Sequence, residues 1–403
     1  MNPPVLTPKR AAALTAVLGL LSIFPPLATD MYLAAMGTLA DAMNASHAST
    51  ELSLSLFFLG LCFGQLLIGP LIDGYGRKGP LLAGTALFAA TSIALPLVND
   101  IAIFNGLRFV QAIGASAGMV VGRTIVNDLY QGQRAAKVMT VLVMLLTIGP
   151  IVSPTLGSLL LATFGWQSIF VTMASVSLVA LVLSQLIIPE TLPADKRTNT
   201  PFRNGRKSAA TLLTRWSFVI PAVMTGLIQG GMFAFITGSS GVFQGVFGLS
   251  ALSYGLVFAL IAAALILFGQ LNSILLNRFT PKQILSRGLP IYVLATLGGL
   301  MMSGTSSIVL FVIPLWISVG MVGLLSANVM SIAMAETRDN AGMGSALLGA
   351  IQFAIAFTVS TCVALGGTDT PLAMSLGLLL PACAALLLSL AASRNDQRAP
   401  VDA

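Results

Sequence analysis

Two ionisable side chains, Asp30 and Arg108, lie inside long apolar segments of this 403-residue sequence, and Asp30 is the only acid well inside such a segment. A charged side chain in hydrocarbon costs at least about 2.5–3.5 kcal/mol, so an intramembrane acid is a functional candidate by default. A carboxylate can avoid the cost by binding a proton, whereas a guanidinium cannot release one. The pair therefore indicates reversible protonation at Asp30.

Helical geometry places the two side chains at comparable depths. Asp30 lies about ten residues from the outer end of its segment and Arg108 about seven, or about 15 and 10 Å. If they meet, Arg108 favours the carboxylate while desolvation favours the neutral acid. Gln111, one turn away, could hydrogen-bond either group. Alternatively, Asp30 caps a break made by Pro25-Pro26 or faces a wet vestibule, and Arg108 binds only backbone carbonyls.

The elements that must hold these residues are membrane-spanning helices. The sequence is 56% hydrophobic and 8% charged, against roughly a quarter charged in an ordinary soluble domain. Its apolar residues form blocks of about 18–28, each long enough to cross a hydrocarbon core. We predict an all-α polytopic membrane protein with twelve transmembrane helices, at 11–36, 52–72, 80–98, 101–127, 138–162, 168–188, 217–238, 251–276, 288–304, 308–334, 342–366 and 371–391.

The net charge of +7 reports topology and gives no indication of a nucleic-acid partner. With a cytoplasmic N-terminus, 18 of the 20 Lys and Arg residues fall on the inner side, and the other two, Arg108 and Arg123, lie within spans. The positive-inside rule then places both termini in the cytoplasm of a protein of the cell inner (plasma) membrane. The first segment is too long for a signal peptide and contains Asp30, so we interpret it as an uncleaved helix.

The longest polar stretch, 189–216, divides the chain into six predicted spans on each side. It is rich in Pro, Thr and basic residues, and we predict a cytoplasmic linker with a short surface helix near its end. The halves are then 1–188 and 217–403. A faint repeat supports the division, because the pattern at 69–78 recurs in weaker form at 273–282.

Three motifs lie in successive parts of the first half. The loop GPLIDGYGRKG at 69–79 resembles the signature of the major facilitator superfamily, with Gly74 in place of its first arginine. LRFVQAIGASAG at 107–118 resembles that family's fourth-span motif, and IGPIVSPTLGSLL at 148–160 is similar to its proton-antiporter motif. TDMYLAAM at 29–36, with GRTIVNDLY at 122–130, resembles the Bcr/CflA group of drug exporters.

The resemblance implies a function as well as a fold. The fold would be two six-helix halves, with substrate bound near the midplane between them. The function would be a proton-coupled secondary antiporter that exports drug-like or small metabolite molecules, with Asp30 as a proton and substrate site. A symporter or facilitator of a small metabolite on the same fold is the alternative. A channel or receptor, a third possibility, would leave Asp30 and Arg108 without a shared role.

The resemblance also implies a gate and a seal. In the gate, the loop acid would meet the N-terminal end of span eleven near 341–345, where a helix favours a carboxylate, and the arginine would pair with an acid of span four. The alternative is a plain solvated turn. The expected gating residues are Asp73, Arg77, Arg123 and Asp128. The antiporter motif contributes Gly149, Pro150, Pro154 and Gly157, which either seal against proton leak or serve ordinary helix packing.

The substrate pocket should be apolar with a few polar groups. Besides Asp30 and Gln111, span seven offers four side chains at helical spacing: Gln229, Met232, Phe233 and Ile236. No metal, cofactor or nucleotide motif is present, so we expect small molecules, protons and the lipid bilayer as partners, no nucleic acid and no nucleotide. We expect a monomeric transporter, not an enzyme.

Overall fold

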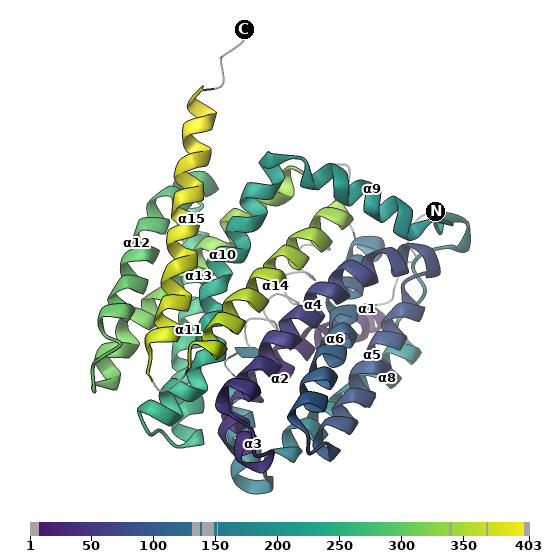
Figure 1. Cartoon of the computed structure of the whole chain (residues 1–403). Coiled ribbons are helices and arrows are strands. Elements are labelled where there is room, and N and C mark those ends of the chain that lie inside the picture. Colours follow the sequence, from purple (N-terminus) through teal and green to yellow (C-terminus); the bar gives the residue numbers. More distant parts are fainter. Residues whose placement is uncertain are drawn as a thin grey trace. The chain divides into compact units, whose positions relative to one another are not determined.

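The computed structural model describes residues 8–130, 138, 149–150, 152–337, 341–367 and 370–398. Over these residues the regular structure is helical and contains no strand (Figure 1). Eleven of the described helical segments are long and apolar enough to cross a membrane. The predicted all-α polytopic fold is therefore confirmed. Of the predicted fifth span, 138–162, residues 139–148 and 151 lie outside the described residues, and Val152–Phe164 forms a shorter apolar helix.

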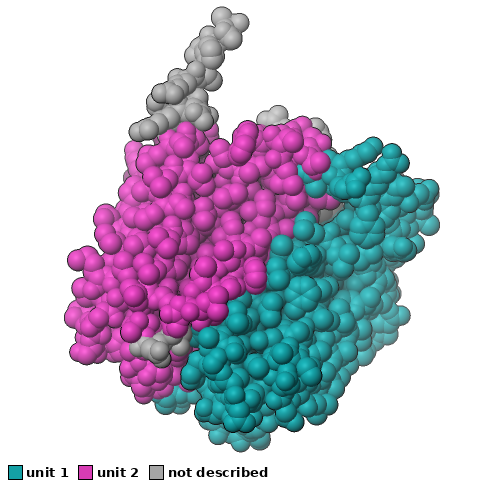
Figure 2. Space-filling model, viewed as in Figure 1, with its two compact units in different colours: residues 1–209, 250–259 teal, residues 210–249, 260–403 magenta. Residues whose placement is uncertain are grey.

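The chain forms two compact units, shown in Figure 2, consisting of 1–209 with 250–259 and of 210–249 with 260–403. The long helices of the first unit follow one another in the order α4 (His47–Tyr75), α5 (Lys78–Ala94), α6 (Ile101–Leu129) and α8 (Gln167–Ile187). The second unit contains α10 (Trp216–Ser240), most of α11 (Ala251–Leu275), α12 (Pro281–Met301), α13 (Ile308–Ala335), α14 (Ala341–Leu365) and α15 (Leu372–Arg398). The linker carries the expected short helix, α9 (Pro201–Leu213). The proposed division at 189–216 stays a prediction.

Polar residues fix where the long helices begin. The carboxylate of Asp100 accepts hydrogen bonds from the backbone of Ala102 and Ile103 at the start of α6. Ser46 accepts from the Ser49 backbone at the start of α4. These caps satisfy N–H groups that have no partner inside the helix. Apolar residues then continue for five turns or more, long enough to cross the bilayer.

The first span is broken, which the sequence analysis predicted only as an alternative. It comprises α1 (Pro8–Ser22), α2 (Phe24–Asp30), the 3₁₀ turn η1 (Leu33–Ala35) and α3 (Met36–Ala42). Pro25 and Pro26 lie in the first turn of α2, where a missing N–H costs no helical hydrogen bond. Irregular backbone at membrane depth is tolerated where protein buries it or water reaches it. The break places Asp30 at the last residue of α2.

The second span begins earlier than predicted, and this changes the count of buried acids. The apolar pattern placed its start at residue 52, but the Ser46 cap starts α4 at His47. Glu51 therefore lies inside the helix and is only 2% exposed. Asp30 is therefore not the only buried acid of the described spans.

Candidate functional site

Asp30 is a buried carboxyl group at the break in span one. Its side chain belongs to a residue that is 1% exposed, and it accepts a 2.8 Å hydrogen bond from the hydroxyl of Thr29. Among the described residues no cation lies within ion-pair distance of it. An ionised carboxylate is costly in such a place, so the neutral, protonated form is favoured in this conformation.

Arg108 approaches the same break from α6, but it binds backbone instead of the acid. Its Nη2 donates a 2.6 Å hydrogen bond to the carbonyl oxygen of Ala28. Its guanidinium lies over two rings, 4.9 Å from the centre of Tyr32 and 4.6 Å from that of Phe57. A cation is favoured beside the last carbonyls of a helix and over aromatic faces. Arg108 thereby stabilises the C-terminal end of α2 next to Asp30.

Gln111 holds Arg108 in this position. Its Oε1 accepts a 2.6 Å hydrogen bond from Nη1 of Arg108, and its Nε2 donates to Ser92 at 2.8 Å and to the sulfur of Met173. The residue has no exposed surface. Because these contacts use both ends of the amide, the geometry favours a positioning role for Gln111 over direct contact with substrate.

The glycines of the antiporter motif pack directly on the broken span. A Cβ atom added to Gly157 would overlap the backbone carbonyl oxygen of Met31, and one added to Gly149 would lie 2.7 Å from Cβ of Pro26. Close helix approach of this kind requires small residues. Pro154 accepts a hydrogen bond from Ser158 through its carbonyl oxygen. The motif therefore fixes the backbone on both sides of Asp30.

Three of the four expected gating residues lie in a cluster around Arg77, which we call the loop cluster: Asp73, Arg77, Asp128, Glu190 and Thr191. Arg77 bonds the carboxylates of Asp73 at 2.8 Å and of Asp128 at 3.1 Å. Asp73 itself has a side chain 59% exposed, whereas that of Arg77 is 10% exposed. Arg123 has no ion pair among the described residues, so the structure gathers three of the four expected gating residues.

Glu190 and Thr191 are members of the loop cluster that sequence reasoning missed. Glu190 accepts hydrogen bonds from the backbone N–H groups of Arg77 at 2.8 Å and Lys78 at 3.2 Å, at the start of α5. The Thr191 hydroxyl donates to Asp128 at 2.7 Å. A signal existed in the sequence, because an acid at the inner end of a span faces a basic loop. The missing information was which loop it meets.

Burial tends to raise the pKa of Glu190, but its partners outweigh that effect. Backbone N–H groups of Arg77, Leu192 and Lys78 donate to its carboxylate, and the guanidinium of Arg197 lies 3.7 Å away. These donors and the positive charge favour the ionised form and hold the pKa of Glu190 below its ordinary value. Glu190 is therefore an anion at neutral pH.

The predicted pocket residues of span seven lie along α10 in the second unit. Gln229 accepts a hydrogen bond from Nε2 of Gln352 on α14. Phe233 packs against Phe353 of the same helix, with ring centres 5.9 Å apart. Met232 and Ile236 are buried. The polar and aromatic residues expected to contact substrate thus lie where α10 meets α14.

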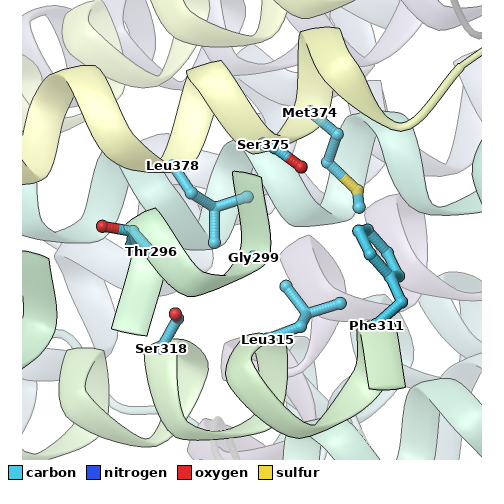
Figure 3. A pocket seen from close by; sticks show the side chains of 8 residues that line it. All are labelled: Thr296, Gly299, Phe311, Leu315, Ser318, Met374, Ser375 and Leu378. Atoms are coloured by element: carbon cyan, nitrogen blue, oxygen red, sulfur yellow. The ribbon is translucent and has the colours of Figure 1, made fainter. Parts of the chain in front are cut away.

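The second unit also contains a small cavity, shown in Figure 3, away from these residues. Thr296, Ser318 and Ser375 supply its hydroxyl groups. The rest of the lining consists of Gly299 and four apolar side chains: Phe311, Leu315, Met374 and Leu378. Its volume is about 10 Å³, which is close to the space that one water needs. None of the predicted substrate residues lines it, and it is too small for a drug-sized ligand.

Comparison with known proteins identifies relatives across most of the chain. The model of the Major Facilitator Superfamily matches residues 18–361. The chain is 32% identical to an uncharacterized MFS-type transporter, YdgK, of Bacillus subtilis (strain 168), over 90% of this chain and 91% of the relative. It is 30% identical to a bicyclomycin resistance protein homolog of Haemophilus influenzae (strain ATCC 51907 / DSM 11121 / KW20 / Rd), over 89% and 91%.

Two further comparisons extend this result. The chain is 31% identical to the multidrug resistance protein MdtL of Escherichia coli O127:H6 (strain E2348/69 / EPEC), over 81% of this chain and 82% of the relative. The crystal structure of a D-xylose-proton symporter superposes with a TM-score of 0.78 at 16% identity, covering 94% of this chain and 96% of that one. At this identity the structural match shows the fold alone.

Proposed function

The chain belongs to the major facilitator superfamily, and we propose that it is a proton-coupled antiporter that exports drug-like or small metabolite molecules across the inner membrane. The observation that carries the proposal is the buried Asp30 carboxyl at the break in span one. The names of the bicyclomycin and multidrug resistance relatives support export of drug-like molecules. The antiporter-motif glycines packed on the same break support proton exchange.

Asp30 would exchange one proton for one substrate molecule. When water reaches the break, the carboxylate is solvated and can release its proton; when the break is closed, the neutral acid is favoured. Substrate and proton would then compete for Asp30, and each would shift the population of conformations that it binds better. Arg108 takes part by bonding the Ala28 carbonyl of α2, so it would stabilise the local backbone in both protonation states.

The second unit would supply most of the substrate contacts. Met232, Phe233 and Ile236 provide apolar surface, and the Gln229 side chain, bonded to Gln352, provides a polar group that substrate can compete for. An apolar pocket with few polar groups suits substrates of varied structure. We keep Asp30 as the polar contact of the first unit.

The loop cluster would act as an inner gate. Its ion pairs and hydrogen bonds join α4, α6 and the segment that follows α8. Breaking or remaking them would change how readily the cytoplasmic side opens. Asp73 is exposed enough to exchange partners during that movement, and the N-terminal end of α14 is its proposed second partner.

We further propose that the basic loops, the linker and both termini are cytoplasmic, in accord with the positive-inside rule. An impermeant thiol reagent, applied to intact cells that carry Asn204→Cys or Ser46→Cys in a cysteine-free background, tests the topology. We expect labelling at position 46 only. Labelling at 204 in intact cells would reverse the assignment.

The functional test uses everted membrane vesicles that carry an imposed proton gradient. A panel of antibiotics, dyes and nucleobase analogues is added in turn. For an antiporter, a transported compound dissipates the gradient and is itself accumulated against its concentration gradient. Passive equilibration of a compound, with no effect of any imposed gradient, would replace the proposal with a facilitator. Accumulation in the same direction as the protons would replace it with a symporter.

A further inference from the structure

We propose that Glu51 is a second proton-binding carboxyl group of the transporter, which is neutral in the conformation described here and exchanges its proton during the transport cycle. This inference rests on the proposed antiport, because it assigns a second proton to the same cycle. Asp30 remains the group for which substrate and proton compete. Glu51 would instead add driving force to transport.

The first observation is the burial of Glu51 without compensation. The residue is 2% exposed, and its Oε2 atom has no hydrogen-bond partner in the described part of the chain. No described Lys, Arg or His lies within ion-pair distance of it. An ionised carboxylate that is buried in an apolar interior without a partner costs several kcal/mol. A proton on Glu51 removes that charge.

The second observation concerns Asn105 of α6, which bonds the backbone near the start of α4. Its Nδ2 donates a 3.1 Å hydrogen bond to the backbone oxygen of Ser49, two residues before Glu51, while its Oδ1 has no hydrogen-bond partner in the part of the chain that the structure describes. Glu51 Oε2 on α4 and Asn105 Oδ1 on α6 are thus two buried oxygen acceptors that lack donors among the described residues. Buried acceptors without donors are rare in native proteins. A protonated Glu51 supplies a donor in this region.

The charged groups on the packed helices of the first unit do not compensate Glu51. On α6, Arg108 is held by Gln111, Ala28 and two aromatic rings. On α4 and α3, His47 and Asp41 are exposed. The remaining charged groups of these helices, and Lys78 of α5, lie toward the opposite end, as does Tyr75: Asp73, Arg123 and Asp128. The thiol of Cys62 lies in the middle of α4. Asp100 caps the start of α6 from an exposed position.

The third observation connects Glu51 to the segment that carries Asp30. The hydroxyl of Tyr32 accepts a 3.0 Å hydrogen bond from Ser53 and donates one of 3.4 Å to the backbone oxygen of Thr50, on either side of Glu51 in α4. These two hydrogen bonds join the turn of α4 that carries Glu51 to Tyr32, two residues from Asp30 at the break in span one.

The direct test is isotope-edited infrared spectroscopy of the full-length purified protein. The sequence contains three glutamates, Glu51, Glu190 and Glu336, and among them Glu51 alone is buried. Carboxyl-¹³C glutamate shifts the carbonyl band of a protonated glutamic acid but leaves aspartic acids unchanged. At neutral pH we expect an isotope-shifted acid band in the parent and in Asp41→Asn, and its loss in Glu51→Gln. No shifted acid band in the folded parent protein would overturn the proposal.

This measurement needs neither transport nor a known substrate, so it stands apart from the proposed function. If proton antiport is absent while the acid band is present, the proposed function fails but the assignment of a buried neutral Glu51 holds. The decisive band is measured in the parent protein, so the test remains valid even if the Glu51→Gln variant does not fold.

A second experiment tests whether Glu51 exchanges that proton during transport. Proteoliposomes are held at a fixed proton gradient, and the substrate gradient that they sustain gives the number of protons exchanged per substrate. Glu51→Gln should still export, but with one proton fewer per substrate than the parent or Asp41→Asn. It should also keep a pH-dependent substrate affinity, which a merely structural defect would not preserve selectively. An unchanged proton-to-substrate ratio in Glu51→Gln would overturn the proposed exchange.

Discussion

Nη2 of Arg108 donates its hydrogen bond to the carbonyl oxygen of Ala28, two residues before Asp30, and no ion pair joins Arg108 to Asp30. The cation thus acts on the acid through the backbone that carries it. Because the carboxylate has no permanent counter-charge, its protonation remains reversible. An intimate ion pair would oppose that, since it favours the ionised acid.

The first prediction concerns the geometry of this cation. In Arg108→Lys the charge remains, but an ammonium group cannot bond Gln111 and Ala28 in one plane while it lies over the Tyr32 and Phe57 rings. We expect loss of uphill export and a loss of stability on the order of 2 kcal/mol. Thermal unfolding of the purified variant checks this, with the exposed Arg203→Lys as control. Parent-like export and stability in Arg108→Lys would contradict the assigned contacts.

The second prediction concerns the antiporter motif. In Gly157→Ala the new methyl group meets the Met31 carbonyl oxygen, so the helix must move away from the broken span. We expect weaker proton-driven export and faster proton leak in proteoliposomes. Gly106→Ala is the matched control, because a Cβ atom there has nothing within 4 Å. Equal leak and export in the two variants would show that this close contact has no role in sealing.

The third prediction concerns the pH dependence of the loop cluster. A carboxylate with a lowered pKa stabilises the fold above its ordinary pKa, and the contribution is lost as pH falls through its folded pKa. At neutral pH, Glu190→Gln should lower stability by on the order of 1 kcal/mol, since the group is partly exposed. The difference in Tm from the parent should shrink below about pH 4.5, the ordinary value for Glu. A Tm difference that is independent of pH, or matched by the exposed Glu336→Gln, would refute it.

The fourth prediction separates the gate from the binding site. Asp73→Asn removes the charge that bonds Arg77 but leaves Asp30 and α10 unchanged. We expect slower transport with parent-like substrate affinity, measured by equilibrium binding to purified protein. Asp195→Asn, an exposed acid of the linker, should transport normally. Loss of substrate binding in folded Asp73→Asn would place this residue in the binding site instead.

Composition and block length were sufficient to predict the fold, because a bilayer admits few solutions for an apolar chain. Helix geometry also led us to expect Asp30 and Arg108 at comparable depths, and Arg108 does bond the backbone two residues from Asp30. The Arg108–Ala28 hydrogen bond could not be predicted, because it depends on where Pro25-Pro26 break span one. Glu51 was missed because one polar cap, Ser46, starts α4 five residues before the predicted span.

Glu190 shows a different limit of the sequence. Its partner Arg77 is 113 residues away along the chain, and no local pattern states which loops meet. Gln111 shows a third limit, since one amide can bind substrate or neighbours and only the packing of α5, α6 and α8 decides. In each case the residue type was visible, and the tertiary contacts supplied its partner.

The central claim, that proton and substrate compete at Asp30, is tested by substrate affinity as a function of pH. Asp30→Asn keeps the size and hydrogen-bonding capacity of the side chain but removes its titration. In the parent and in Asp41→Asn, the account predicts that affinity changes with pH across the neutral range. It predicts a pH-independent affinity and no uphill export for Asp30→Asn. The same pH profile in Asp30→Asn and the parent would contradict the account.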